Sequence, residues 1–259
     1  GTTLLLGAVL FAFQIYGDFC GYSDIALGTA RLFGIELLRN FAFPYFSRDI
    51  AEFWRRWHIS LSSWFRDYLY IPLGGSKGGK WMRARNTFII FLVSGFWHGA
   101  NWTFIVWGLL NALYIMPSII FGTNRVNLDS VAHGRFLPSV KELFSILTTF
   151  TLTVFAWIFF RSESISHALG FIKKMGVGMV QKSGYVETLN LLYWEINPLV
   201  LVLVLLFVFI EWLGREQQYA IAKLGMHWNR PVRLVFYYCI VLLVIRLSGE
   251  EHEFIYFQF

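Results

Sequence analysis

Long apolar runs separated by short polar stretches recur along the whole chain. A helix needs about 20 predominantly apolar residues to cross the hydrocarbon core of a bilayer. Two runs are of full length, and four are shorter or begin near a chain end. The six runs are Leu4–Tyr16, Thr87–Trp97, Trp102–Phe121, Leu143–Phe160, Pro198–Trp212 and Leu234–Leu247. This pattern predicts an all-α, polytopic integral membrane protein.

The segment between the first two runs has a different pattern. Residues 44–85 mix basic side chains with tryptophan, namely Arg55, Arg56, Arg66, Lys77, Lys80, Arg83 and Arg85 with Trp54, Trp57, Trp64 and Trp81. Such a mixture cannot cross lipid as an ordinary span, because charged side chains are costly in hydrocarbon. It is typical of helices that lie in the membrane interface or re-enter a protein-lined cavity. We therefore expect one transmembrane domain over residues 1–259, with an interfacial segment at about 44–85 and a polar tunnel.

Composition and charge agree with membrane insertion. Hydrophobic residues make up 56% of the 259 and charged residues 15%, against roughly 25% charged residues in soluble domains. The net charge is +6, but the basic residues gather in short loops beside apolar runs, as the positive-inside rule describes. We expect membrane lipid as the surroundings and no nucleic-acid partner. The two cysteines lie in apolar runs without metal-ligand spacing, so no metal site is expected.

His98 is a candidate for chemistry because of its predicted depth. It lies in Ser94-Gly95-Phe96-Trp97-His98-Gly99-Ala100-Asn101, between two apolar runs. The run before it, about eleven residues, would extend roughly 17 Å as a helix, which is about half of a hydrocarbon core. An ionisable residue at that depth is a functional candidate. A neutral histidine bonded to a neighbouring helix is an equally good interpretation of the position alone.

His58 lies in a stretch whose apolar residues recur at helical spacing, Phe53-Trp54-Arg55-Arg56-Trp57-His58-Ile59-Ser60-Leu61. Composition alone favours an interfacial amphipathic helix here. Residues 53–75 and 94–108 together, however, resemble the membrane-bound O-acyltransferase family. The similarity is greatest to the bacterial branch with the alginate O-acetylation and D-alanyl transfer membrane proteins. The block 14–24 and the ending 254–259 resemble that branch as well.

The resemblance extends over nearly the whole chain and rests on several linked motifs. Gly17 and Cys20 depart from it, where the family pattern has an aromatic residue and a serine. Members of the family are nearly twice as long as this chain, so the resemblance implies that an N-terminal half precedes it.

The resemblance implies that His98 is the catalytic histidine and that His58 is a second polar position of the site. Acyl transfer from a thioester to a hydroxyl needs a base with a pKa near 7, and imidazole supplies one. It also needs donors for the developing oxyanion. Asn101, Trp97 and His58 are candidates, and the sequence does not choose among them. We predict that the two imidazoles face one cavity, with their rings less than about 10 Å apart so that a water or substrate group bridges them.

A glycine-rich stretch at residues 74–80, Gly-Gly-Ser-Lys-Gly-Gly-Lys, invites a phosphate-binding interpretation. It lacks the spacing of a P-loop. Backbone amides here, together with Lys77, Lys80 and Arg83, are candidates for binding a phosphate of the acyl donor. A flexible loop that only sets membrane topology is the simpler interpretation and is favoured by the sequence alone.

The resemblance implies acyl transfer, with acetyl as the expected group. The donor would be a thioester, acetyl-CoA or an acyl carrier protein, and no permanently bound cofactor is expected. The acceptor would be an exported polysaccharide such as alginate, reached through an extracytoplasmic partner protein at the bacterial cytoplasmic membrane. D-alanyl transfer to teichoic acid is the alternative among enzymes, and a transporter or a non-catalytic scaffold is the alternative outside them. The presence of both His58 and His98 argues against the scaffold.

Overall fold

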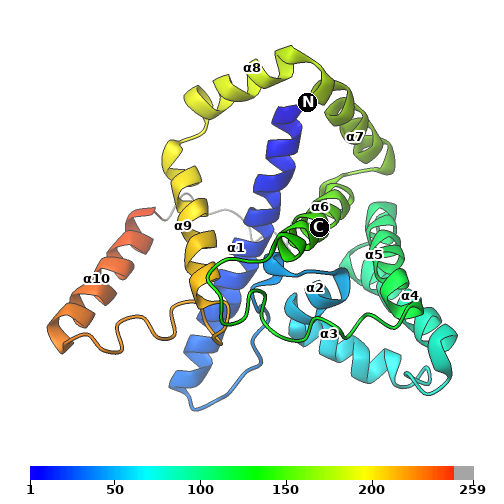
Figure 1. Cartoon of the computed structure of the whole chain (residues 1–259), viewed down its shortest axis with the longest axis horizontal. Helices are drawn as coiled ribbons and strands as arrows, with labels where there is room; N and C mark the ends of the chain where they lie inside the picture. Colours follow the sequence, from blue (N-terminus) through cyan, green and yellow to red (C-terminus); the bar gives the residue numbers. More distant parts are fainter. Residues whose placement is uncertain (248–259) are drawn as a thin grey trace.

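The computed structural model describes residues 1–247, and every regular element in that range is helical. Figure 1 shows the arrangement of these helices. The longer ones are α1 (Thr2–Leu32), α4 (Gly79–His98), α5 (Trp102–Ile120), α6 (Val140–Arg161), α7 (Ile165–Val180), α9 (Pro198–Gly214) and α10 (Arg230–Leu247). The shorter ones are η1 (Pro44–Phe46), α2 (Ile50–Arg56), α3 (Ile59–Phe65), η2 (Arg66–Tyr70), α8 (Lys182–Asn190) and η3 (Leu191–Glu195). The predicted all-α class is confirmed.

Three helices, α1, α5 and α6, are long and apolar enough to cross a membrane. The pair Tyr185–Tyr193 and α9, bent by 96°, meets the same measure if it is one broken span. Each of the six predicted apolar runs lies in a helix, so the prediction of a polytopic membrane protein is confirmed. The helix that contains the second run begins at Gly79 rather than at Thr87. Hydropathy locates the part of a helix that suits lipid, whereas the helix itself continues through polar positions.

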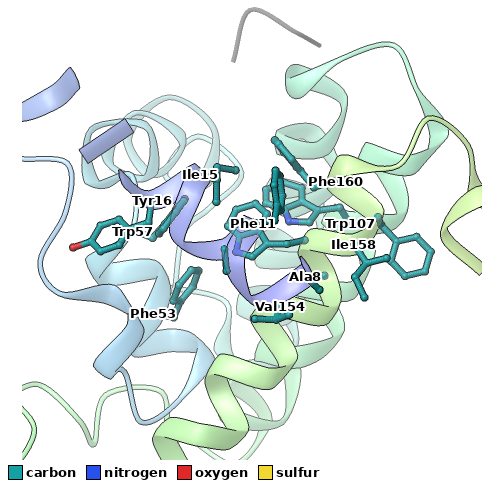
Figure 2. Close-up of a cluster of buried hydrophobic side chains, with 14 of the residues drawn as sticks. Ala8, Phe11, Ile15, Tyr16, Phe53, Trp57, Trp107, Val154, Ile158 and Phe160 are labelled. Atoms are coloured by element: carbon teal, nitrogen blue, oxygen red, sulfur yellow. The ribbon is translucent and has the colours of Figure 1, made fainter. Parts of the chain in front are cut away.

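Aromatic side chains form the core where α1, α5 and α6 meet the interfacial segment (Figure 2). Trp57, Trp107 and Trp157 are each 2% exposed. The Trp157 ring lies 5.2 Å from that of Trp57 and is stacked on that of Trp107 at 5.8 Å, between ring centroids. Aromatic pairs of this kind add about 0.5–1.5 kcal/mol each beyond the burial of their area. The core therefore joins α2 to two of the spanning helices.

The backbones of α4 and α5 touch. A Cβ atom on Gly95 would lie 2.4 Å from the carbonyl oxygen of Phe104, and one on Gly108 would lie 2.3 Å from that of Phe91. Both contacts are far inside van der Waals distance, so any larger side chain would force the helices apart. Small residues allow this close approach between helices in a membrane. The two helices therefore form one tight hairpin.

A buried ionic cluster fixes the start of the interfacial segment. Glu52 is 1% exposed, and its carboxylate accepts hydrogen bonds from Arg48 at 3.0 Å and from Arg56 at 2.6 Å. Arg48 also binds the carboxylate of Asp129 at 2.9 Å. A buried carboxylate is tolerated when it is paired and hydrogen-bonded in this way. The cluster thus joins α2 to the loop that follows α5.

Two further arginines hold the same loop, residues 122–139, through its carbonyl groups. Arg55 donates to the carbonyl oxygens of Asn124 and Asn127, at 2.7 and 2.8 Å. Arg215, at the end of α9, donates to that of Val131 at 2.9 Å. The loop after α5 is therefore bonded both to α2 and to the end of α9.

Candidate active site

A cavity of about 670 Å³ lies between the interfacial segment, α4 and the loop after α5. This volume is in the range of small-molecule sites. One face of α4 lines it, through Arg83, Thr87, Ile90, Phe91, Ser94 and His98. The spacing follows the helical repeat, and at 1.5 Å per residue the stripe is about 22 Å long. Residues of α3 and η2 also line the cavity: Leu61, Ser62, Phe65, Arg66 and Tyr70. The cavity therefore leads from an arginine at one end of α4 to a histidine at the other.

His98 is the last residue of α4, and aromatic rings surround it. Its imidazole lies 5.0 Å from the ring of Trp97, 5.1 Å from that of Trp107 and 5.1 Å from that of Phe160, all edge to face. Such contacts restrict the rotation of the imidazole.

His58 has a strained backbone between α2 and α3. Its φ of 45° and ψ of 54° are left-handed, a conformation that costs a residue other than glycine about 1–3 kcal/mol and that concentrates at functional sites. The imidazole packs edge to face on Phe19 at 4.6 Å. Its Nδ1 is buried with no hydrogen-bond partner among the described residues. The left-handed backbone therefore places the His58 imidazole, with its unpaired Nδ1, at the cavity wall.

Burial lowers the pKa of His58, which lies outside the spanning helices, to about 4. The ring is then neutral at pH 7, with one nitrogen that donates and one that accepts. Because the shift comes from desolvation, it disfavours the charged form of the ring. His58 is thus suited to donate a hydrogen bond at neutral pH.

The structure brings together the two histidines that the sequence singles out. His58 and His98 both line the cavity, so the prediction that they face one cavity is confirmed. Their ring separation and their roles in catalysis stay predictions. Arg83 lines the same cavity and is half-buried, and its Nε has no hydrogen-bond partner among the described residues.

Two of the predicted phosphate-binding residues lie elsewhere. Lys77 is in the turn before α4 and Lys80 is on its first turn; both are exposed, and neither lines the cavity. The Lys80 ammonium instead lies 5.8 Å from the centre of the Trp81 ring. The two lysines therefore do not line this cavity with Arg83, and their role in binding a phosphate stays a prediction.

The structure also separates Asn101 and Trp97 from the cavity wall. Asn101 caps α5: its Oδ1 accepts from the backbone N–H of Thr103 at 3.0 Å, and its Nδ2 donates to the carbonyl of Glu163 at 2.8 Å. The expected oxyanion role of Asn101 conflicts with this use of its amide. Trp97 contacts the His98 ring but is not among the lining residues and is 55% exposed. Of the three oxyanion candidates, only His58 lines the cavity.

Three more arginines line the cavity beside Arg83, and the sequence did not single them out as site residues. They are Arg55, Arg66 and Arg125. None of the described lining residues is acidic. Arg125 comes from the loop after α5, which Arg55 holds through the carbonyl of Asn124. The charge pattern marks this loop as basic, but only the folded chain shows that it reaches the cavity.

Sequence comparisons identify the family of the chain. The family model of the membrane-bound O-acyltransferases matches residues 3–159. A protein named probable alginate O-acetylase, from Pseudomonas putida, is 35% identical over 98% of this chain and 53% of its own length. The chain belongs to the membrane-bound O-acyltransferase family.

Other relatives carry different names for the polymer. The peptidoglycan O-acetyltransferase of Helicobacter pylori is 41% identical over 64% of this chain and 30% of its own length. The teichoic acid D-alanyltransferase of Streptococcus thermophilus is 34% identical over 64% of this chain and 42% of its own length. The chain spans about half the length of the curated relative that it matches most extensively.

Proposed function

We propose that this chain contains the reaction centre of a membrane O-acyltransferase that moves an acyl group from a thioester to a hydroxyl. The supporting observation is one cavity that joins two imidazoles to a cluster of arginines, in a chain of this family. An arginine cluster suits the anionic part of a thioester donor. The imidazoles suit proton transfer at the other end.

In the proposed reaction, His98 accepts the proton of the acceptor hydroxyl while the hydroxyl oxygen attacks the thioester carbonyl. The carbonyl oxygen becomes an oxyanion, and the neutral imidazole of His58 donates a hydrogen bond to it. The carbon–sulfur bond then breaks, and the leaving thiolate takes the proton from His98. In this proposed step the acceptor gains the acyl group and the donor thiol gains the proton, without a cofactor.

The charge of the cavity favours a neutral acyl group. A D-alanyl group carries an ammonium, which would lie near His98 and its aromatic neighbours, with no carboxylate among the described lining residues to pair with it. Burying an unpaired charge is unfavourable. We expect kcat/KM for an acetyl thioester to exceed that for a D-alanyl thioester of the same carrier by about tenfold or more. Competition between the two donors in proteoliposomes measures this ratio. A preference for the D-alanyl thioester would contradict acetyl transfer and favour D-alanyl transfer, the activity named for the Streptococcus thermophilus relative.

Arg83 is the proposed contact for the anionic end of the donor. Its guanidinium Nε is buried and unsatisfied, and hydrogen bonds to charged groups contribute about 1.5–3 kcal/mol. Arg83→Gln should therefore raise the apparent KM for the donor about tenfold or more, with a smaller effect on kcat. Lys77→Gln combined with Lys80→Gln is the matched control, because those side chains lie outside the cavity. If the double lysine variant raised the donor KM as much as Arg83→Gln, the positive charge of residues 74–83 as a whole, rather than the cavity contact of Arg83, would explain the effect.

The proposed acceptor is a hydroxyl of an exported polysaccharide, reached directly or through an extracytoplasmic partner protein. The names of the relatives support it, since they specify alginate, peptidoglycan and teichoic acid. The proposed location is the bacterial cytoplasmic membrane, with the arginine end of the cavity in the cytoplasm. The clustering of basic segments at that end supports this orientation.

A further inference from the structure

The glycine-rich turn before α4 reaches the candidate active-site cavity, although its lysines do not line it. Ser76 of this turn and Tyr70 at the end of η2 are both lining residues. Their hydroxyl oxygens lie 2.9 Å apart, within hydrogen-bond distance. The Ser76 side chain is exposed, so the cavity is open beside this pair. The turn therefore brings two neighbouring hydroxyl groups, rather than an ammonium group, to the cavity.

One buried side chain of α4 holds the turn in place. Asn86 is 0% exposed, and its Nδ2 donates hydrogen bonds to the carbonyl oxygens of Leu73 and Gly75, at 3.2 and 3.0 Å. The carbonyl of Gly75 belongs to the peptide group that joins this glycine to Ser76. Asn86 therefore fixes the stretch of backbone from which the Ser76 side chain projects.

The hydrogen bonds of the Asn86 amide are complete. Its Oδ1 accepts from Nε and Nη2 of Arg85, at 3.1 and 2.9 Å, and the same guanidinium donates to the carbonyl oxygen of Leu73 at 3.1 Å. An amide side chain can donate two hydrogen bonds and accept two. The partners also set the orientation of the amide, because the opposite orientation would place its oxygen against two carbonyl oxygens. Asn86 thus has no group left for a substrate and acts only through the turn.

The conformation of the turn depends on this support. Gly74 and Gly75 have φ of 99° and 56°, a region that glycine enters without the steric cost of a Cβ atom. The N–H of Gly75 donates to the carbonyl oxygen of Tyr70 at 2.8 Å, which joins the turn to η2. Glycine also gives the backbone access to many other conformations. Two successive glycines therefore need contacts from outside the turn to keep Ser76 at the cavity, and Asn86 supplies them.

The two hydroxyl groups complement an arginine of the same cavity. Arg83 has a buried Nε with no hydrogen-bond partner among the described residues. Arg66 also lines the cavity, but its guanidinium is paired with Asp67 at 2.7 Å. A phosphate presents several strong acceptor oxygens, and it accepts hydrogen bonds from guanidinium groups and hydroxyls together. Ser76, Tyr70 and Arg83 are donors of the kinds that such a group requires.

We propose that Asn86 is a positioning residue for the donor, and that the turn it holds presents the hydroxyls of Ser76 and Tyr70 to a phosphate of the thioester. This inference rests on the proposed acyl transfer, and it gives the glycine-rich stretch a role that does not depend on its lysines. Thioesters of coenzyme A and of an acyl carrier protein both carry a phosphate on the arm that ends in the thiol. The site therefore suits either donor.

The test compares two donors that share this arm: acetyl-CoA, which carries phosphates, and acetylpantetheine, which carries none. The dissociation constant of each is measured with the whole protein in detergent. Ser76→Ala and Asn86→Ala should each raise the dissociation constant of acetyl-CoA about tenfold, the usual effect of losing a hydrogen bond to a charged group. Neither should change that of acetylpantetheine. A role in folding alone would not distinguish the two thioesters.

Two variants serve as controls for the serine. Ser76→Thr keeps the hydroxyl and should bind acetyl-CoA about as tightly as the original protein. Ser63→Ala removes a half-buried hydroxyl that donates to the carbonyl of Ile59 within α3 and lies outside the cavity. It should leave both dissociation constants unchanged. If Asn86→Ala does not fold, Ser76→Ala and Tyr70→Phe take its place, because each removes a single hydroxyl from the edge of the cavity.

The contrary results are distinct. Unchanged binding of acetyl-CoA in the folded variants overturns the proposal, and so does an equal loss of affinity for the two thioesters. If the original protein does not bind acetyl-CoA, the acetyl thioester of an acyl carrier protein takes its place with the same expectations, and failure to bind that donor also overturns the proposal. Acyl transfer from the bound thioesters is measured separately in proteoliposomes. Binding without any transfer would contradict the proposed function and not the phosphate site.

Discussion

Replacing His98 with alanine is expected to lower acyl transfer by a factor of about 10² to 10⁴, the usual contribution of general acid–base catalysis. The imidazole lies at the inner end of the cavity, held by Trp97, Trp107 and Phe160. Among the described lining residues only His58 and His98 carry an imidazole and none carries a carboxylate, and burial lowers the pKa of His58 to about 4. The rate of acyl transfer from a thioester donor in proteoliposomes measures the effect.

His227→Ala is the matched control, because His227 is exposed and lies outside the cavity. It should leave the rate near that of the original protein. The amount of protein in the membrane and its elution as a single species in detergent establish that the His98 variant is folded. Transfer at more than a tenth of the original rate in such a preparation would remove His98 from the proposed mechanism.

Removing the buried carboxylate of Glu52 should give the largest loss of stability. In Glu52→Ala, the guanidinium groups of Arg48 and Arg56 remain in place while their shared partner is gone. Breaking a buried ion pair from one side costs about 3–5 kcal/mol, and the cost falls mainly on Arg56, because Arg48 keeps its ion pair with Asp129. The midpoint of thermal unfolding in detergent, compared with that of the original protein, measures the change.

Glu36→Ala supplies the comparison for the loss of a carboxylate in general. Glu36 pairs with Arg31 on the surface, and its side chain is 77% exposed. Surface ion pairs contribute at most about 1 kcal/mol. A similar shift in the two variants would mean that the cluster around Glu52 has no special role. A large shift for Glu52 alone would show that the interfacial segment is held by its ionic core.

The apolar helices can be predicted from the sequence because the hydropathy of a segment depends only on the residues within it. The run Trp102–Phe121 is almost identical to the helix Trp102–Ile120 in the structure. Hydropathy fails to predict helix ends that carry charged residues. The first turns of α4 contain Lys80, Arg83 and Arg85 and are nevertheless helical. Hydropathy therefore predicts the parts of helices that suit lipid and misses their polar extensions.

The candidate site is only partly predictable. The motif of each histidine is visible in the sequence, and both side chains line the cavity. The position of Arg125 depends on the hydrogen bond from Arg55 to the carbonyl of Asn124, across 69 residues of sequence. No local pattern encodes such a contact. Asn101 is one of three oxyanion candidates in the sequence, and only the structure shows that its Oδ1 caps α5.

The tight hairpin of α4 and α5 has a consequence for how the donor is selected. The stripe from Arg83 to His98 lies on a single helix, whose length is fixed by its backbone hydrogen bonds, and α5 is in backbone contact with that helix at Gly95 and Gly108. The distance along it is fixed at about 22 Å, with Arg83, the proposed anion contact, at one end and the imidazole at the other. A donor whose arm is too short leaves its carbonyl before His98, and one whose arm is too long carries the carbonyl beyond it. Selection among thioesters then depends on the length of the molecule as well as on its chemical groups.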